Sequence, residues 1–383
     1  MNKIKVIHLI KTLNLGGAEI NLYNLIQAID HGRFEVHIGY SFGGVFEEKF
    51  RASGIKLFKF AHGDHKIKSF ATFGIIIRLI RYILRYRIDI IHSHSLNAHI
   101  WGSVAAKITR RKTIEHVHDF RYFPVDELKR RKGMVRQFKY LKYLRMSDIV
   151  IVLTRQNYNF LVDKKYYLEK NVREMQNGIC VSNIVAYPEK SAAFKKELGI
   201  PDDCRVVLTP CRISPEKNVD IILRIAPVVA KTFKNVIFLI SGDGPSLTSL
   251  KRQCQELQLD GIVKSIGFYE NIYELLSFTD ILLLPSFVEL HSIAILEALS
   301  MKIPVIASQG VGCNDEFIKS WENGILLNPF SDQGWTESIL KLLQDDSLLR
   351  KIGQAGYQTC VENFNINDIA RKIESLYVEL AKK

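Results

Sequence analysis

Short apolar runs alternate with amphipathic helical segments along the whole chain. Many of these runs are apolar at nearly every position, which is typical of strands buried on both faces of a parallel sheet. The pattern predicts an α/β fold with two sheets of about six strands each. The expected strands are 5–10, 35–40, 56–60, 89–95, 112–119 and 148–154 in the first half, and 205–210, 235–242, 263–268, 280–286, 304–308 and 324–328 in the second.

A polar stretch at 182–203, which contains two prolines, interrupts this alternation and looks like a connection between domains. We therefore place a boundary near residue 190. The sequence then predicts two Rossmann-like domains, 1–190 and 191–365. An amphipathic helix at 366–383 follows them and can cross back to the first domain. Since 383 residues is long for a single domain, the length agrees with this division.

The composition is that of a globular protein, with 47% hydrophobic and 24% charged residues. We find no run long and apolar enough for a transmembrane helix, and the first residues read as a buried strand rather than a signal peptide. The six cysteines form no C-x-x-C pair, so we expect reduced, mostly buried thiols and no zinc site. These features favour a cytoplasmic location.

Positive charge is concentrated in the first half of the chain. Residues 1–190 carry 33 Lys and Arg against 16 Asp and Glu, whereas residues 191–383 carry 20 against 24. The net charge of +13 therefore comes from the first domain, which suggests that a polyanion or an anionic membrane surface faces it. We recognise no nucleic-acid-binding motif, so nucleic acid is not expected as a partner.

Two basic segments could form such a surface. The stretch 65–87 is apolar on one face and carries basic residues at roughly helical spacing, and a second cluster spans 128–145. Basic amphipathic segments rich in Tyr and Phe are typical of elements that lie on anionic membranes. The first segment is equally consistent with an ordinary core helix that has a charged edge. Its basic residues are Arg78, Arg81, Arg85 and Arg87.

Candidate ligand-binding groups follow predicted strands. Gly16 and Gly17 stand where a helix would begin, and they allow close approach of an anion or simply form a turn. Arg212 and Lys217 lie in a loop between a strand and a helix, where they suit a diphosphate unless they are solvated surface charges. Gly242 opens the turn 242–245, which lacks the third glycine and the acidic residue of a dinucleotide fingerprint.

Two glutamates, Glu289 and Glu297, flank a mostly apolar stretch. On one helix they would lie about 12 Å apart along the axis, too far to act on one atom but suitable for the two ends of an extended ligand. Ser292 is a good N-cap, so we expect Glu289 in a loop and free backbone amides near Ile293. Hydroxyl groups at both ends and an anion between them describe a nucleotide-sugar.

The order of these motifs resembles the GT4 family of retaining glycosyltransferases, which have the GT-B fold. In the second half the landmarks are Arg-x4-Lys at Arg212 and Lys217, "SGDGP", "IGF" (266–268), Glu-x7-Glu at Glu289 and Glu297, "IPVIAS" and "NGILLNP". The first half adds the Gly-Gly loop, "DIIHSHS", "HVHD" and "NGI" (177–179). The resemblance extends over essentially the whole chain.

The resemblance implies a role for each matching residue. Gly17 would lie near the donor phosphates and the acceptor, and His118 near the reacting sugar. Arg212 and Lys217 would stabilise the leaving diphosphate. Glu289 would contact hydroxyls of the donor sugar, and Glu297 would bind the ribose. The first domain of such proteins binds the acceptor.

The sequence departs from the family pattern after the first glutamate. The usual glycine-rich segment is replaced by Leu290, His291 and Ser292, which we expect to reshape the sugar pocket. His291 could instead be a partly exposed polar contact. His92, His94 and His99 lack the companions of a metal site and are interpreted as structural or acceptor-pocket residues. With no Asp-x-Asp in the chain, we expect cationic side chains and helix amino termini to replace a metal.

We therefore expect a metal-independent, retaining glycosyltransferase that needs no cofactor. It would move a hexose or N-acetylhexosamine from a nucleotide-diphosphate sugar, with a UDP-sugar favoured, to a glycan or lipid-linked glycan in cell-surface polysaccharide synthesis. The enzyme would work in the cytoplasm, at the inner face of the membrane. Two alternatives remain: a nucleotide-sugar epimerase on the same fold, and a non-catalytic module that binds nucleotide-sugars.

Overall fold

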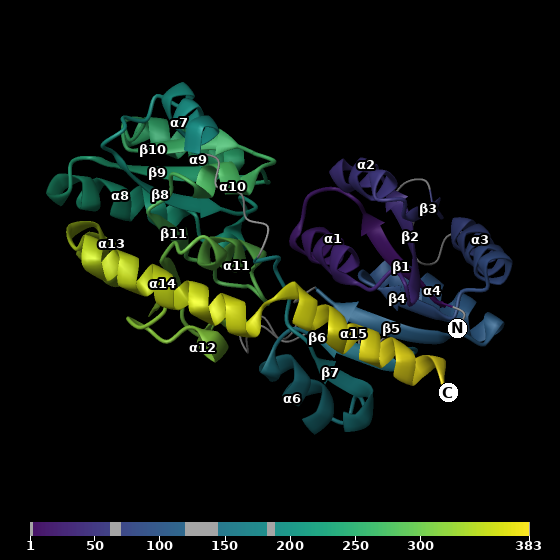
Figure 1. The fold of residues 1–383 in the computed structure, drawn as a ribbon. Coiled ribbons are helices and arrows are strands. Elements are labelled where there is room, and N and C mark those ends of the chain that lie inside the picture. Colours follow the sequence, from purple (N-terminus) through teal and green to yellow (C-terminus); the bar gives the residue numbers. More distant parts are fainter. Residues whose placement is uncertain (1–2, 62–69, 119–144, 182–187, 383) are drawn as a thin grey trace. The chain divides into compact units, whose positions relative to one another are not determined.

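The computed structural model describes residues 3–61, 70–118, 145–181 and 188–382. The chain forms two compact units, one made of Met1–Gly178 together with Ile366–Lys383, and the other of Ile179–Asn365 (Figure 1). The predicted boundary near residue 190 falls after this division. The reason is that part of the polar stretch folds as helix α7 (Pro188–Glu197), whose Phe194 stacks on Tyr269 of the second unit.

The first unit contains a sheet of seven parallel strands in the order β3-β2-β1-β4-β5-β6-β7. Each of the six strands predicted for this half is present, and β7 is an additional short edge strand that the sequence did not predict. The bounds are β1 (Ile4–Thr12), β2 (Phe34–Phe42), β3 (Lys56–Lys59), β4 (Ile90–Ser93), β5 (Lys112–Val117), β6 (Ile149–Val152) and β7 (Val172–Glu174).

Helices cover both faces of this sheet, as an all-parallel sheet requires. Helix α4 packs on β1, β4 and β5 and supports α3, whereas α15 lies beside α1 and packs on β1 and β4. The C-terminal helix therefore belongs to the first unit. The bounds are α1 (Gly17–Ala28), α2 (Val45–Ala52), α3 (Phe70–Tyr86), α4 (Leu96–Thr109), α6 (Arg155–Asp163), the 3₁₀ turn η2 (Glu169–Asn171) and α15 (Ile366–Ala381).

The second unit repeats the plan with six parallel strands in the order β10-β9-β8-β11-β12-β13, which match the six predicted strands. Strands β9, β11 and β12 are buried at every position, which explains their continuous apolar sequences. The bounds are β8 (Arg205–Pro210), β9 (Val236–Ser241), β10 (Val263–Gly267), β11 (Ile281–Leu284), β12 (Val305–Ser308) and β13 (Ile325–Leu327).

Helices on both faces complete the core of the second unit. Helices α8 and α13 pack against each other, and α11 packs against α14. The largest fully buried side chain of the protein, Trp335, lies in this core. The bounds are η3 (Pro215–Lys217, a 3₁₀ turn), α8 (Asp220–Thr232), α9 (Leu247–Glu256), α10 (Ile272–Leu276), α11 (Ile293–Ser300), α12 (Asn314–Phe317), α13 (Asp332–Gln344) and α14 (Asp346–Asn363).

The prediction of two Rossmann-like domains with parallel sheets is confirmed. All six cysteines are free, and four of them are buried. Within the described residues, every helix is too short or too polar to cross a membrane.

Candidate active site

The sheet order of the second unit gathers its predicted site residues. Strands β9, β8, β11 and β12 are neighbours, so the loops after their carboxyl ends lie at the same edge of the sheet. Arg212 and Lys217 follow β8, Gly242 follows β9, and Glu289 follows β11. Ligands of open parallel sheets bind at this edge.

The loop that carries Arg212 is fixed by the neighbouring glycine turn. The amide of Cys211 donates to the Ser241 carbonyl at 3.0 Å, and that of Ile213 donates to the Asp243 carbonyl at 2.9 Å. A Cβ atom on Gly242 would lie 1.9 Å from the Cys211 carbonyl oxygen, and Gly242 has a φ of 150°. Only glycine fits at this contact. Gly242 therefore positions the backbone on both sides of the exposed Arg212 side chain.

The structure places Lys217 directly against Glu289. The Lys217 Nζ atom donates to Glu289 Oε1 at 2.5 Å, and the Ser286 hydroxyl donates to the same oxygen at 3.1 Å. Both charged side chains are mostly buried, with exposed fractions of 18% and 14%. The sequence predicted a site role for each residue but not this ion pair, which joins the loops after β8 and β11.

The helix that carries Glu297 begins where the sequence predicted. Helix α11 starts at Ile293 with Ser292 as its N-cap, and Glu289 lies in the preceding loop. The Ser292 hydroxyl makes no capping hydrogen bond, however, so the first backbone amides of the helix are not satisfied by that side chain. A short helix thus begins between the two glutamates.

Glu297 is a buried acid on an apolar helix. Its side chain is 6% exposed, and burial raises the pKa of its carboxyl group to about 8. The charge of Glu297 also adds to the effect of burial in raising the pKa of the neighbouring Tyr273 phenol. Among the described residues, no hydrogen bond to the Glu297 carboxylate is present. A carboxyl group in this setting needs a polar partner when it ionises.

In the segment that departs from the family pattern, the side chain of His291 is buried. Its side chain is 5% exposed and packs against the rings of Phe317 and Phe364, with centroid distances of 5.6 and 5.1 Å. Burial lowers the pKa of His291 to about 3. The interpretation as a partly exposed polar contact is therefore wrong, because the aromatic cluster draws this ring into the core. The effect of the segment on a sugar pocket stays a prediction.

The loop after β12 braces the same segment. The amide of Cys313 donates to the Leu290 carbonyl at 2.9 Å, and Gly312 has a φ of 61°. A Cβ atom on Gly312 would lie 2.3 Å from the Leu290 carbonyl oxygen, so this glycine is required for the close approach of the two backbones.

In the first unit, the predicted Gly-Gly turn leads directly into helix α1. Gly16 is the N-cap and Gly17 the first helical residue. Glu19 lies in the first turn of this helix and was not predicted as a site residue, and burial raises the pKa of its carboxyl group to about 7. A Cβ atom on Gly16 would lie 2.5 Å from Glu19 Oε2, so this carboxyl group packs over the turn. An acidic residue directly after a Gly-Gly turn was the available signal.

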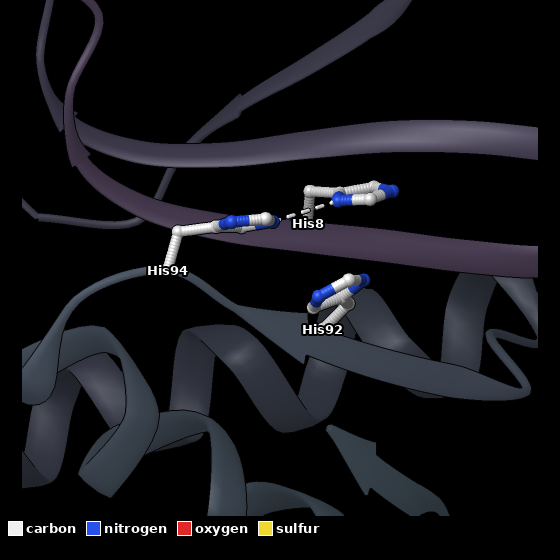
Figure 2. A group of neighbouring side chains, drawn as sticks. All are labelled: His8, His92 and His94. Atoms are coloured by element: carbon white, nitrogen blue, oxygen red, sulfur yellow. Dashed lines mark hydrogen bonds between the residues drawn. The ribbon is translucent and has the colours of Figure 1, made fainter. Parts of the chain in front are cut away.

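His118 lies at the end of β5 within a group of five histidines that also includes His8, His92, His94 and His116. Figure 2 shows three of these rings: His8 on β1, His92 on β4, and His94 just after β4. His118 is half-buried and the other four are buried. Loss of contact with water lowers the pKa of His118 to about 4 and that of His8 to about 3. His8 and Tyr377, which contacts His8 and His92, were missed because only the fold brings them to this place.

The other predicted histidine, His99, lies apart from this group. Its Nδ1 atom is 2.9 Å from Glu115 Oε2, and both side chains are buried. This supports the structural interpretation of His99. In contrast, the five-histidine group contains two triplets whose ring nitrogens lie within 4.8 Å of one another, a spacing that could hold a metal ion. They are His8, His92 and His94, and His94, His116 and His118.

Comparison with known proteins defines the class. The protein-family model described as "Glycosyltransferase Family 4" matches residues 15–183. A second family model, described as "Glycosyl transferases group 1", matches residues 190–359. The protein is therefore a glycosyltransferase, and the prediction of enzymatic activity is confirmed. It belongs to the GT4-type glycosyltransferases with the GT-B fold.

Individual relatives are distant but extend over most of the chain. An Escherichia coli UDP-Gal:alpha-D-GlcNAc-diphosphoundecaprenol alpha-1,3-galactosyltransferase is 24% identical over 80% of this chain and 79% of that protein. An Acholeplasma laidlawii alpha-monoglucosyldiacylglycerol synthase is 22% identical over 83% and 82%. The crystal structure of Anabaena HepE in complex with UDP and glucose has a TM-score of 0.84 at 20% identity, covering 98% of this chain and 100% of that one.

Proposed function

We propose that this protein is a retaining, metal-independent glycosyltransferase that uses a UDP-sugar. It would transfer a hexose or N-acetylhexosamine to a glycan or lipid-linked glycan acceptor in cell-surface polysaccharide synthesis. The observation that carries this proposal is the arrangement around helix α11, with the Lys217–Glu289 pair before it and the buried Glu297 within it. The UDP in the HepE structure and the UDP-galactose in the name of the E. coli relative support the choice of donor.

In this proposal, positive groups stabilise the leaving UDP. Arg212 and Lys217 contact the diphosphate, and the first amides of α11 add donors from the helix amino terminus. Lys217 then exchanges part of its interaction with Glu289 for the phosphate. Because these groups supply the positive charge, the proposed reaction needs no divalent metal and no other cofactor.

The two glutamates hold the ends of the donor. Glu289 accepts hydrogen bonds from sugar hydroxyls, while Glu297 accepts them from the ribose hydroxyls. The buried Glu297 carboxyl, with its pKa near 8, gains these partners only when the donor is present. The proposed acceptor hydroxyl attacks on the face from which UDP leaves, so the configuration at the sugar is retained. His118 would lie near the reacting sugar.

We further propose that the first unit contacts an anionic membrane at the inner face of the cell membrane, where a lipid-linked acceptor would be presented. Helix α3 supports this proposal, because Arg78, Arg81 and Arg85 are exposed on it while Ile75 and Leu79 are buried. Its Phe73 and Leu84 side chains are also exposed, at 71% and 55%. The second basic cluster, 128–145, lies almost entirely outside the described residues.

A thermal-shift panel with UDP-, GDP-, ADP- and dTDP-sugars tests the donor proposal. A ligand at 100 times its Kd adds about 2.7 kcal/mol of stability, or a few degrees in Tm. We expect a shift with one UDP-sugar that is lost in Arg212→Ala and Glu297→Ala. No shift with any nucleotide-sugar in folded protein would contradict the proposal.

Product analysis then separates the transferase from its alternatives. The enzyme should consume the UDP-sugar only with a glycan or lipid-linked acceptor, at the same rate in EDTA, and form the product with the donor's anomeric configuration. Conversion of the donor to its epimer without an acceptor would show an epimerase. Binding without turnover across a panel of acceptors would indicate a non-catalytic module.

A further inference from the structure

The five histidines of the first unit lie on neighbouring strands near their carboxyl ends. His8 of β1 is directly opposite His92 of β4 in the sheet register. His94 follows β4, and His116 and His118 lie on and just after β5. Parallel strands place side chains two residues apart on the same face, so the sequence pairs His92/His94 and His116/His118 each contribute two rings to one face. Helix α15 contributes Tyr377 to this group.

Four of the histidines and Tyr377 form one continuous hydrogen-bonded chain. His118 Nε2 is 3.1 Å from His94 Nδ1, and His94 Nε2 is 3.0 Å from His8 Nδ1 (the dashed line in Figure 2). The Tyr377 hydroxyl is 3.3 Å from His8 Nε2 and 2.7 Å from His92 Nδ1. Both ring nitrogens of His94 and of His8 are therefore used.

The geometry of these contacts fits hydrogen bonds and not a metal. The ring centroids are 5.3 Å apart for His8 and His94 and 5.4 Å for His94 and His118. Each separation exceeds the nitrogen–nitrogen distance by about the width of one imidazole ring, so the nitrogens point straight at each other. An ion on that line would lie about 1.5 Å from each nitrogen, whereas zinc needs about 2.0 Å.

The hydrogen bonds in this chain of side chains must all be donated in the same direction. Burial lowers the pKa of each histidine in it well below the ordinary value, so all four are neutral at pH 7 and carry one N–H each. If His94 donates through Nδ1, it must accept through Nε2, and the same holds at His8. The Tyr377 hydroxyl must likewise donate to one histidine and accept from the other, because a hydroxyl that accepted from both would leave its own buried O–H without a partner. The proton positions along the whole chain therefore follow from the direction at either end.

The inner end of the chain decides this direction. His92 Nε2 is buried and has no hydrogen-bond partner among the described residues. If the donors ran from His118 inward, this nitrogen would carry an orphaned N–H. If they run from His92 outward, it carries only an unused lone pair. Buried N–H groups without partners are rarer than buried acceptors without partners, so the outward direction is favoured.

We propose that His94 is a positioning residue that holds His118 in the tautomer protonated on Nδ1. His94 donates its Nδ1–H to His118 Nε2 and is itself held in register by His8 and Tyr377. His118 then offers an N–H donor from its other nitrogen. The tautomer is a property of the free protein. Its use, as a fixed donor toward the reacting sugar, rests on the function proposed above.

Nuclear magnetic resonance of histidine ring nitrogens in the full-length, ¹⁵N-labelled protein tests the tautomer without any substrate. His118→Gln identifies the His118 signals. We expect the two-bond proton–nitrogen pattern of an Nδ1–H tautomer at pH 7. An Nε2–H or doubly protonated His118 would overturn the proposal, and so would stoichiometric zinc in the purified protein whose removal changes the histidine spectrum.

Two variants of similar size separate positioning from packing. The amide of Asn at position 94 occupies the place of Nδ1 and can still donate to His118, whereas the amide of Gln reaches the place of Nε2 and can bond only to His8. We expect His94→Asn to keep the Nδ1–H tautomer and His94→Gln to shift His118 to Nε2–H, with both variants folded by circular dichroism. The same tautomer in both variants would overturn the role of His94.

Turnover links the tautomer to transfer. We expect His94→Gln to lower kcat about tenfold, the effect of one misplaced hydrogen-bond donor, with KM for the donor little changed. His94→Asn should recover most of that loss. Equal losses in the two variants, despite different tautomers, would overturn the catalytic use of the tautomer. A wild-type protein that shows the tautomer but no transfer would contradict the proposed function while leaving the positioning inference intact.

Discussion

The two units share a fold but place their polar groups differently. In the second unit the strands β9 and β11 are apolar nearly throughout, and the candidate site residues lie in loops and within a short helix. In the first unit the polar groups are part of the strands: His8, His92 and His116 are buried on the sheet itself. A site on loops can rearrange around a ligand, whereas a site within strands is fixed when the unit folds.

The sharpest test of the loop site is Lys217→Ala. Removing a cation that stabilises a leaving group typically lowers kcat by about 10²–10³-fold. Stability should also fall, because the substitution leaves the mostly buried Glu289 carboxylate without its cation and with only the Ser286 hydroxyl as a partner. Steady-state kinetics with the UDP-sugar and thermal melting measure the two effects. Arg78→Ala, on the exposed side of α3, is the control and should retain kcat in solution.

Gly242→Ala tests whether the loop site depends on the glycine turn. Its Cβ atom would collide with the Cys211 carbonyl and would require a strained φ, so we expect a loss of about 2–4 kcal/mol in the free energy of unfolding and weaker donor binding. Gly261→Ala is the matched control, since a Cβ atom there meets nothing within 4 Å. Equal denaturation midpoints for the two variants would show that the contact is not needed.

Tyr377→Phe tests the fixed polar core of the first unit. The change removes the hydroxyl that bridges His8 and His92, leaving buried ring nitrogens without that partner. We expect a loss of about 1–3 kcal/mol in urea denaturation. Tyr158→Phe removes a hydroxyl that bonds to Glu169 at the surface and should cost less than about 0.5 kcal/mol. Similar costs for both would mean that the hydrogen-bonded chain adds nothing to stability.

Glu297 provides a pH test that returns to the second unit. Its folded pKa of about 8 lies above the ordinary glutamate value of 4.5, so between these values the folded protein binds more protons than the unfolded chain. The stabilising contribution of the protonated carboxyl is complete below pH 4.5 and is lost as the pH rises toward 8. Relative to Glu297→Gln, the wild-type Tm should fall by a few degrees from pH 5 to pH 8. A constant difference would contradict the raised pKa.

The sequence predicted local features of this structure well and contacts between distant residues poorly. Apolar runs such as those of β9 and β11 predicted strands because burial on both faces leaves a local signal. The start of α11 at Ile293 was predictable from the serine before it. Strand β7 was missed because it is only three residues long, and only Val172 in it is fully buried.

Distant contacts left no such signal. The Lys217–Glu289 pair joins residues 72 positions apart, and the contact of Tyr377 with His8 joins residues 369 apart. The resemblance of the motif order to a known family was enough to predict Lys217 and Glu289 in one site, but not their contact. Nothing local to His8, a polar residue within an apolar run, indicated a chain of hydrogen bonds. His291 was interpreted as partly exposed because its aromatic neighbours come from 26 and 73 residues further along the chain.

The return of helix α15 to the first unit has a consequence for biosynthesis. Residues 179–365 form a unit that is continuous in the chain, so it can fold as soon as it leaves the ribosome. The first unit is made earlier but must wait for α15, whose Glu374 accepts a hydrogen bond from the Asp30 amide at 2.7 Å and whose Tyr377 packs on Phe34. Until then the sheet face that α15 covers, which carries His8 and His92, stays open. The half of the protein that is translated first is therefore the half that is completed last.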